Sequence, residues 1–109
     1  MPPVKIEIPA STPRDLRDEF TGLLEQLGPV QELEAKSFNL DTAMLILAGI
    51  SATADLLDIA ARLIDWRDKA RRRSVPLDKV TIVAGEQRIK LHNTDTQTLI
   101  GVLETLRDT

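Results

Sequence analysis

Hydrophobic residues alternate with polar ones at the start of the chain. Val4 to Ile8 carries Val, Ile and Ile at every second position, with Lys5 and Glu7 between them. This period of two is typical of a strand with one buried face, and Pro9 ends it. The pattern therefore predicts a first strand over residues 4 to 8.

A first helix is predicted from its start signal, its apolar spacing and its stop signal. Thr12 offers an N-cap hydroxyl, Pro13 suits the first helical position and Asp15 follows within the first turn. Gly28-Pro29 then ends the helical pattern. The apolar residues between these signals recur at helical spacing, namely Leu16, Phe20, Leu23, Leu24 and Leu27.

The middle of the chain leaves two alternatives open. Val30 to Phe38 alternates again and predicts a second strand. The segment 43–50, "AMLILAGI", fits either a strand buried on both faces or the first turns of one long or broken helix over residues 43–73 with a smaller sheet. That helix would span about 46 Å, which is long for a domain of this size. Gly49 and Ser51 also supply a break and a new N-cap, so we favour a strand followed by a helix.

A long amphipathic helix is predicted from Ala52 to Arg73. Its apolar stripe, formed by Leu56, Ile59, Leu63 and Trp66, lies opposite a charged face, as expected for a helix laid on a sheet. Acids stand four residues before bases on the charged face, which favours ion pairs along the helix. The three such pairs are Asp58 with Arg62, Asp65 with Lys69 and Asp68 with Arg72.

The last third of the chain predicts a hairpin and a closing helix. Lys79 to Ala84 and Gln87 to Leu91 alternate on either side of Gly85-Glu86, and a glycine at the first turn position favours a two-residue hairpin. Thr94 to Gln97 then forms a capping box. The apolar residues of the closing helix are Leu99, Ile100, Leu103 and Leu106.

The resulting order is strand, helix, strand, strand, helix, strand, strand, helix. Its first six elements follow the split βαβ order of ferredoxin-like folds, βαββαβ, to which the chain adds a hairpin strand and a C-terminal helix. A length of 109 residues suits one domain. We therefore expect residues 1–109 to form a single α+β domain.

Composition and charge narrow the classes of function. The formal charge is −3, and residues 1–54 hold four Lys and Arg against eight Asp and Glu, while residues 55–109 hold ten against nine. Neither half has the basic excess of a dedicated nucleic-acid binder. One Trp, two Phe and no Tyr leave few aromatic platforms for stacking bases. The longest uncharged run, residues 42–54, is shorter than the roughly 20 residues of a spanning helix.

The residue types that carry catalysis and metal binding are scarce. The absence of cysteine excludes disulfides, thiolate metal sites and a Cys nucleophile, and it fits a cytoplasmic protein whose start lacks the pattern of a signal peptide. His92 is the only histidine and stands in no metal-binding spacing, and no serine lies in a nucleophile elbow. We expect neither an enzyme nor a cofactor or metal site.

The basic end of the long helix is the strongest candidate site. Trp66 and Arg67 precede three consecutive arginines, Arg71, Arg72 and Arg73. Bases at a helix C-terminus complement the helix dipole, so the cluster is explained by structure alone. The same cluster also suits an acidic protein partner, or nucleic acid and lipid headgroups. Trp66 either packs in the core or anchors an interface, because Trp and Arg dominate the binding energy of many interfaces.

The segment from residue 40 to residue 106 resembles a known family. An apolar segment rich in small residues leads into a helix that ends in Trp and several Arg, and a hairpin and a last helix follow. This order is similar to that of the effector-associated constant component proteins, small accessory proteins of bacterial conflict systems. The matching residues are Trp66, Arg71 to Arg73, Val80-Thr81-Ile82, Gly85, Ile89, Leu91, Asp95, Leu99, Val102, Leu103 and Leu106.

The resemblance implies a non-enzymatic adaptor in bacterial immunity or programmed death, encoded beside a protease-like or other effector. No catalytic or ligand residue comes with it. We therefore expect a protein-interaction module that docks to an effector or self-associates, and that has neither nucleic acid nor a membrane as its partner. Such a module needs an unpaired sheet edge or an exposed apolar patch. The alternative hypothesis is a nucleic-acid or anionic-surface binder that uses Arg67 to Arg73.

Overall fold

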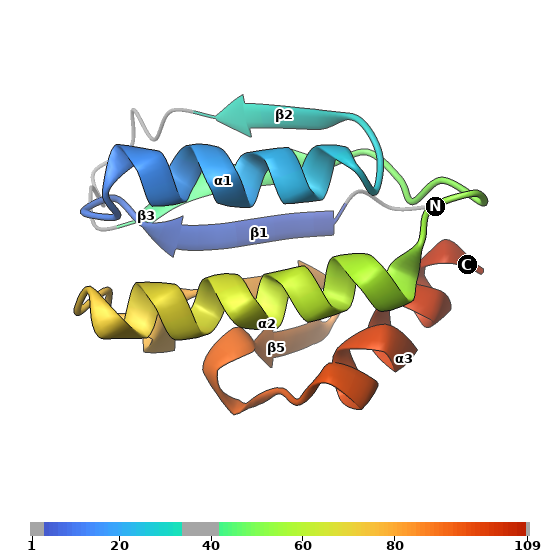
Figure 1. Ribbon diagram of the computed structural model, residues 1–109. Coiled ribbons are helices and arrows are strands. Elements are labelled where there is room, and N and C mark those ends of the chain that lie inside the picture. Colours follow the sequence, from blue (N-terminus) through green and yellow to red (C-terminus); the bar gives the residue numbers. More distant parts are fainter. Residues whose placement is uncertain (1–3, 34–41, 109) are drawn as a thin grey trace.

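The computed structural model describes residues 4–33 and 42–108. Within them the chain forms five strands and three helices, with two short 3-10 turns (Figure 1). The strands are β1 (Val4–Pro9), β2 (Val30–Leu33), β3 (Thr42–Leu47), β4 (Thr81–Ala84) and β5 (Gln87–Lys90). The helices are α1 (Arg14–Glu25), α2 (Leu56–Arg72) and α3 (Thr96–Arg107), and the 3-10 turns are η1 (Leu77–Lys79) and η2 (Leu91–Asn93).

All five strands join one antiparallel sheet in the order β2-β3-β1-β4-β5. β3 lies between β1 and β2, so the two strands that flank α1 in the chain are separated by the strand that follows them. Rows of paired residues cross the whole sheet, one of which runs through Gln31, Ile46, Lys5, Val83 and Arg88. The predicted α+β class is confirmed, with five strands and three helices.

The three helices lie on one side of the sheet, and α2 packs against both α1 and α3 (Figure 1). The side chains of the sheet that point toward the helices are buried, among them Val4, Ile6, Ile8, Leu45 and Leu47. They form one core with residues of all three helices, such as Phe20, Leu63, Trp66, Leu99 and Leu103. Each such fully buried apolar side chain contributes roughly 1.5 to 3 kcal/mol. The opposite face of the sheet carries no helix of the described chain.

Residues 42–47 decide between the two alternatives that the sequence leaves open. They form β3, which pairs with β1 on one side and with β2 on the other. The alternative of one helix over residues 43–73 is therefore wrong. Leu45 and Leu47 face the core, while Met44 and Ile46 are half-buried on the other face. Because a strand flanks β3 on each side, apolar residues are favourable on both of its faces.

α2 begins later than the predicted start at Ala52. Its N-cap is Asp55, whose carboxylate accepts the Asp58 backbone N–H at 3.1 Å. The hydroxyl of Ser51, the predicted cap, instead lies 3.0 Å from the Thr53 hydroxyl. An aspartate is a good cap because its carboxylate both accepts a free N–H and complements the positive end of the helix dipole.

Two threonines for which the sequence predicts helix caps bond elsewhere. Thr12 donates its hydroxyl to the Pro9 carbonyl at 2.6 Å, and α1 has no side-chain cap. Thr94 donates to the Lys90 carbonyl at 2.8 Å, and α3 is capped by Asp95 instead. In both places the hydroxyl ties the loop before a helix to the end of the preceding strand.

The predicted hairpin at Gly85-Glu86 is confirmed. Ala84 pairs with Gln87 across it. Gly85 has a φ of 61° and Glu86 does not share the left-handed conformation, so only the first turn residue requires glycine. The strand ends differ from the prediction, because η1 precedes β4 and Leu91 already belongs to η2.

β2 covers Val30–Leu33, and the predicted continuation over residues 34–38 lies outside the described residues. The longest described helix, α2, spans 17 residues. Nowhere in residues 4–33 and 42–108 is a helix both long and apolar enough to cross a bilayer.

Candidate functional site

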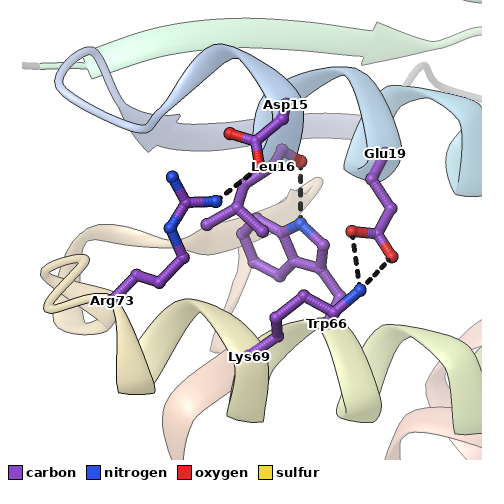
Figure 2. A network of polar contacts seen from close by, with 6 residues as sticks. All are labelled: Asp15, Leu16, Glu19, Trp66, Lys69 and Arg73. Carbon is purple, nitrogen blue, oxygen red and sulfur yellow. Dashed lines mark hydrogen bonds and ion pairs between the residues drawn. The ribbon is translucent and has the colours of Figure 1, made fainter.

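Trp66 lies inside the molecule, at the joint between α1 and α2 (Figure 2). Only 1% of the residue is exposed. Its indole N–H donates to the Leu16 carbonyl of α1 at 2.8 Å, and its ring centroid lies 4.5 Å from that of Phe20, with the planes tilted by 40°. Of the two roles that the sequence allows, the side chain therefore takes the one in the core and offers no surface to a partner.

Two ion pairs between α1 and α2 flank the indole (Figure 2). Lys69 Nζ lies 2.7 Å from Glu19 Oε1, so Lys69 does not pair with the predicted Asp65. Arg73 donates to the carboxylate of Asp15. This hydrogen bond holds the pKa of Asp15 below its ordinary value of 3.8. Arg73, one member of the predicted basic cluster, thus bonds within the protein.

Arg67 is held by the segment that connects β5 to α3. Its Nη1 donates to the Thr94 carbonyl at 2.6 Å and to the Leu91 carbonyl at 3.4 Å, and its Nε donates to Asp68 at 3.3 Å. Only 15% of the side chain is exposed. Arg67 therefore connects α2 to the C-terminal part of the fold, and little of its side chain is accessible to a partner.

The other two arginines of the cluster differ from each other. Arg71 Nη1 lies 3.7 Å from Asp68, so this acid does not pair with Arg72 as the sequence predicts. Arg72 is exposed and has no ion pair within the described residues. The predicted site of Trp66, Arg67 and Arg71 to Arg73 is thus divided between the core, the contacts among elements and the surface.

The described residues hold no cluster suited to a metal ion. Within 4–33 and 42–108, no three His, Cys, Asp or Glu side chains lie close enough together. His92 is half-buried in η2, and its Nδ1 has no hydrogen-bond partner there.

A polar cavity of about 600 Å³ opens beside the first turn of α1, a feature that the sequence did not predict. The described residues that line it are Thr12, Arg14, Arg17, Asp18 and Glu32. Arg17 forms an ion pair with Glu32, and the hydroxyl of Thr12 is engaged by a backbone carbonyl. Among these described residues the cavity presents charges of both signs, Arg14 and Arg17 against Asp18 and Glu32.

β5 is an edge strand, and half of its backbone groups point away from the sheet. The two-residue turn makes Ala84 and Gln87 a hydrogen-bonded pair. Hydrogen bonding alternates along antiparallel strands, so Ile89 also bonds toward β4. Arg88 and Lys90, between and after these residues, direct their backbone groups outward.

Neighbouring hydrogen bonds agree with this alternation. The Leu91 N–H donates to the Val80 carbonyl at 3.2 Å, as the next inward-facing residue should. The Lys90 carbonyl accepts the Thr94 hydroxyl. Within the described chain, the groups left open at this edge are therefore the N–H and carbonyl of Arg88 and the N–H of Lys90.

The side chains of the same two residues lie on the helix-free face of the sheet. Arg88 is opposite Val83, which is opposite Lys5, and directly opposed residues share a face. Lys5, Arg88 and Lys90 are exposed and have no ion pair among the described residues. In the sequence, this feature is visible as two cations at alternate positions of "QRIK". The sequence alone does not show that this strand lies at the edge of the sheet.

Comparison of the chain with protein-family models, curated proteins and solved structures gives no significant match. The resemblance to the effector-associated constant component proteins therefore stays a prediction.

Proposed function

We propose that this chain is a non-enzymatic protein-interaction module that docks a partner by strand addition at β5. The observation that carries the proposal is the row of open backbone groups at Arg88 and Lys90. An extended segment of another protein would satisfy them by main-chain hydrogen bonds, which is a recurrent mode of peptide recognition. Leu57, 67% exposed at the start of α2, is the only large apolar side chain that the described surface exposes, so the sheet edge is the better docking element.

The same proposal includes the architecture that creates this edge. We infer a ferredoxin-like domain with one additional strand, supported by the position of β3 between β1 and β2 and of β4 on the other side of β1. The added strand β5 then covers β4 and becomes the new edge. In such a module, the strand added to the ferredoxin-like fold, β5, would provide the docking surface.

The biological setting that we propose is an accessory role in a bacterial conflict system. It rests on the resemblance over residues 40–106, and the absence of cysteine fits a cytoplasmic location. The partner would be a protease-like or other effector, or a second copy of the chain. Nucleic-acid binding through Arg67 to Arg73 is the weaker hypothesis, because intramolecular acids and carbonyls already engage Arg67, Arg71 and Arg73.

Strand addition is tested by the Arg88→Pro variant. Proline removes the outward N–H and no hydrogen bond to β4, so an edge strand tolerates it there. The matched control, Arg88→Thr, also removes the side-chain charge but keeps the N–H. Effectors encoded beside the gene are co-expressed with each variant, and the co-purified amount is measured.

We expect a neighbouring effector to co-purify with wild type and with Arg88→Thr, and to be lost with Arg88→Pro. Circular dichroism checks that each variant is folded. Undiminished co-purification with a folded Arg88→Pro variant would show that the edge is not the docking element. Light scattering at several concentrations, on wild type and on Arg88→Pro, tests whether a second copy of the chain docks at the same edge.

A further inference from the structure

Ion pairs on the described surface are concentrated on the helices. The basic residues of α1 and α2 mostly pair with acids, as in the contacts of Lys69, Arg71 and Arg73. On the helix-free face of β1 and β5, Lys5, Arg88 and Lys90 stay unpaired within the described residues. Three unpaired cations therefore share the helix-free face, two of them on the edge strand whose backbone is open, while Arg72 and Lys79 are unpaired elsewhere on the described surface.

These three cations lie close enough to act on one ligand. Lys5 and Arg88 occupy one row of the sheet, two strands apart, which corresponds to roughly 10 Å between their Cα atoms. Arg88 and Lys90 lie two residues apart on one strand, roughly 7 Å. A strand added beside β5 would place its own side chains directly opposite Arg88 and Lys90, on the same face.

We propose that the partner segment of β5 is an extended acidic strand in which acids alternate with apolar residues. This inference rests on the proposed function and names the chemistry of its partner. The acids would lie opposite Arg88 and Lys90 on the helix-free face. The apolar residue between them would lie opposite Ile89, which is half-buried and packs against the core on the helix side.

A second β5 is a poor occupant of this edge. Pairing two copies of β5 would bring Arg88 and Lys90 of one copy against the same cations of the other, and like charges directly opposite each other are destabilising. Charged residues on an edge strand are a common means of preventing such association. The two cations therefore select against self-pairing and favour an acidic strand.

Nucleic acid fits the face less well than a peptide does. Both described residues with large aromatic rings, Phe20 and Trp66, are buried in the core, so no described aromatic side chain is available to stack a base. Glu7 shares the row of Lys90, two strands away through Thr81, and adds a negative charge to the middle of the same face.

The test measures binding of labelled peptides of about seven alternating Glu and Val residues by fluorescence anisotropy. A matched peptide replaces every Glu by Gln. The protein variants are Arg88→Glu with Lys90→Glu, and as the matched control Arg71→Glu with Arg72→Glu, which changes the net charge equally at the end of α2. Arg88→Pro, its charge-matched control Arg88→Thr and a polythymidine oligonucleotide complete the set.

We expect the Glu peptide to bind wild type at least about tenfold more tightly than the Gln peptide does. The variant at Arg88 and Lys90 should lose at least about tenfold in affinity for the Glu peptide, and the variant at Arg71 and Arg72 should bind as wild type does. Lys/Val peptides should in turn bind the variant at Arg88 and Lys90 better than wild type. Circular dichroism confirms that each variant is folded.

The failures of the two proposals are distinguishable. Equal binding of the Glu and Gln peptides, with loss only in Arg88→Pro, would overturn the acidic partner and leave strand addition standing. Loss on charge reversal, with a folded Arg88→Pro variant that binds as tightly as Arg88→Thr does, would keep the acidic partner and overturn strand addition. Three results would each overturn the acidic strand: binding of polythymidine in place of the Glu peptide, absence of any binding to that peptide, or a dimer that dissociates in the Arg88→Pro variant.

Discussion

Trp66 links two helices by a polar contact as well as by packing. Its N–H reaches across to the Leu16 carbonyl, and its ring lies against Phe20, so one side chain of α2 fixes both the distance and the rotation of α1. An indole that is buried usually finds such a partner, because leaving the N–H unpaired is costly. The joint therefore depends on the identity of this residue and not only on its size.

Replacing Trp66 by Phe should destabilise the protein by about 1 to 3 kcal/mol, through the lost hydrogen bond and the smaller ring. Urea unfolding followed by circular dichroism measures the change. The control is Leu57→Ala, which alters an exposed apolar side chain and should change stability by less than about 0.5 kcal/mol. Equal stability of the Phe variant and wild type would mean that the hydrogen bond to Leu16 does not matter.

Two aspartates make stability depend on acid pH. Arg73 lowers the pKa of Asp15, and the hydrogen bond from the Thr98 N–H lowers the pKa of Asp95, each below an ordinary value of 3.8. A carboxyl whose pKa is lower in the folded state stabilises that state fully above the ordinary pKa. This contribution is lost as the pH falls through the lowered value.

The variant with Asp15→Asn and Asp95→Asn should accordingly lose less stability than wild type when the pH is reduced below about 4. Thermal unfolding between about pH 2 and pH 7 measures this. Asp65→Asn, at an exposed acid of α2 that has no ion pair among the described residues, is the control and should follow wild type. Parallel curves for the double variant and wild type would contradict the assignment.

At the scale of elements, the sequence predicts what a segment becomes better than where it begins. The pattern of residues 43–50 was compatible with both a strand and a helix. It indicates that the segment is buried on both faces, but it does not show which elements pack beside it. Those neighbours, β1 and β2, come from distant parts of the chain. The caps show the same limit, since Thr94 and Asp95 are both good N-caps, yet in the folded chain Asp95 caps α3 while the Thr94 hydroxyl donates to the Lys90 carbonyl.

The β4–β5 hairpin and α3 allow one substitution to be compared in two settings. An added Cβ at Gly85 or at Gly101 meets no atom within 4 Å, so space is equal at both sites. Gly85 has a φ of 61°, at which a side chain costs about 1 to 2 kcal/mol, whereas Gly101 lies in a helix, where alanine is better by about 0.5 to 1 kcal/mol. Gly85→Ala should therefore lower, and Gly101→Ala raise, the midpoint of urea unfolding. The same sign for both would contradict this account.

At the scale of the whole molecule, ion pairing was the part least accessible from sequence. Spacing of four residues predicts Asp58 with Arg62, and that pair forms at 2.9 Å. The same spacing fails for Asp65 and Lys69, because α1 presents Glu19 to Lys69 once the helices have packed. The candidate site was hard to predict for the same reason, because the folded structure determines which cations remain unpaired.

Removing the two cations of β5 should make the protein associate. In the variant with Arg88→Thr and Lys90→Thr, the edge keeps its open backbone groups and loses the charges that oppose self-pairing. Light scattering should then show a mass that rises with concentration, unlike that of wild type. The control with Arg71→Thr and Arg72→Thr should behave as wild type. If the variant at the edge stays as monodisperse as wild type, these two charges do not prevent self-association.

The burial of Trp66 has an optical consequence. It is the only tryptophan of the chain and lies at the joint of α1 and α2, so the fluorescence of the protein comes mainly from one place. We expect emission at short wavelength from the folded chain and a shift to longer wavelength when α1 leaves α2. A partner that binds at β5 should leave this emission unchanged, so loss of the helical layer and occupation of the sheet edge can be followed as separate signals in one sample.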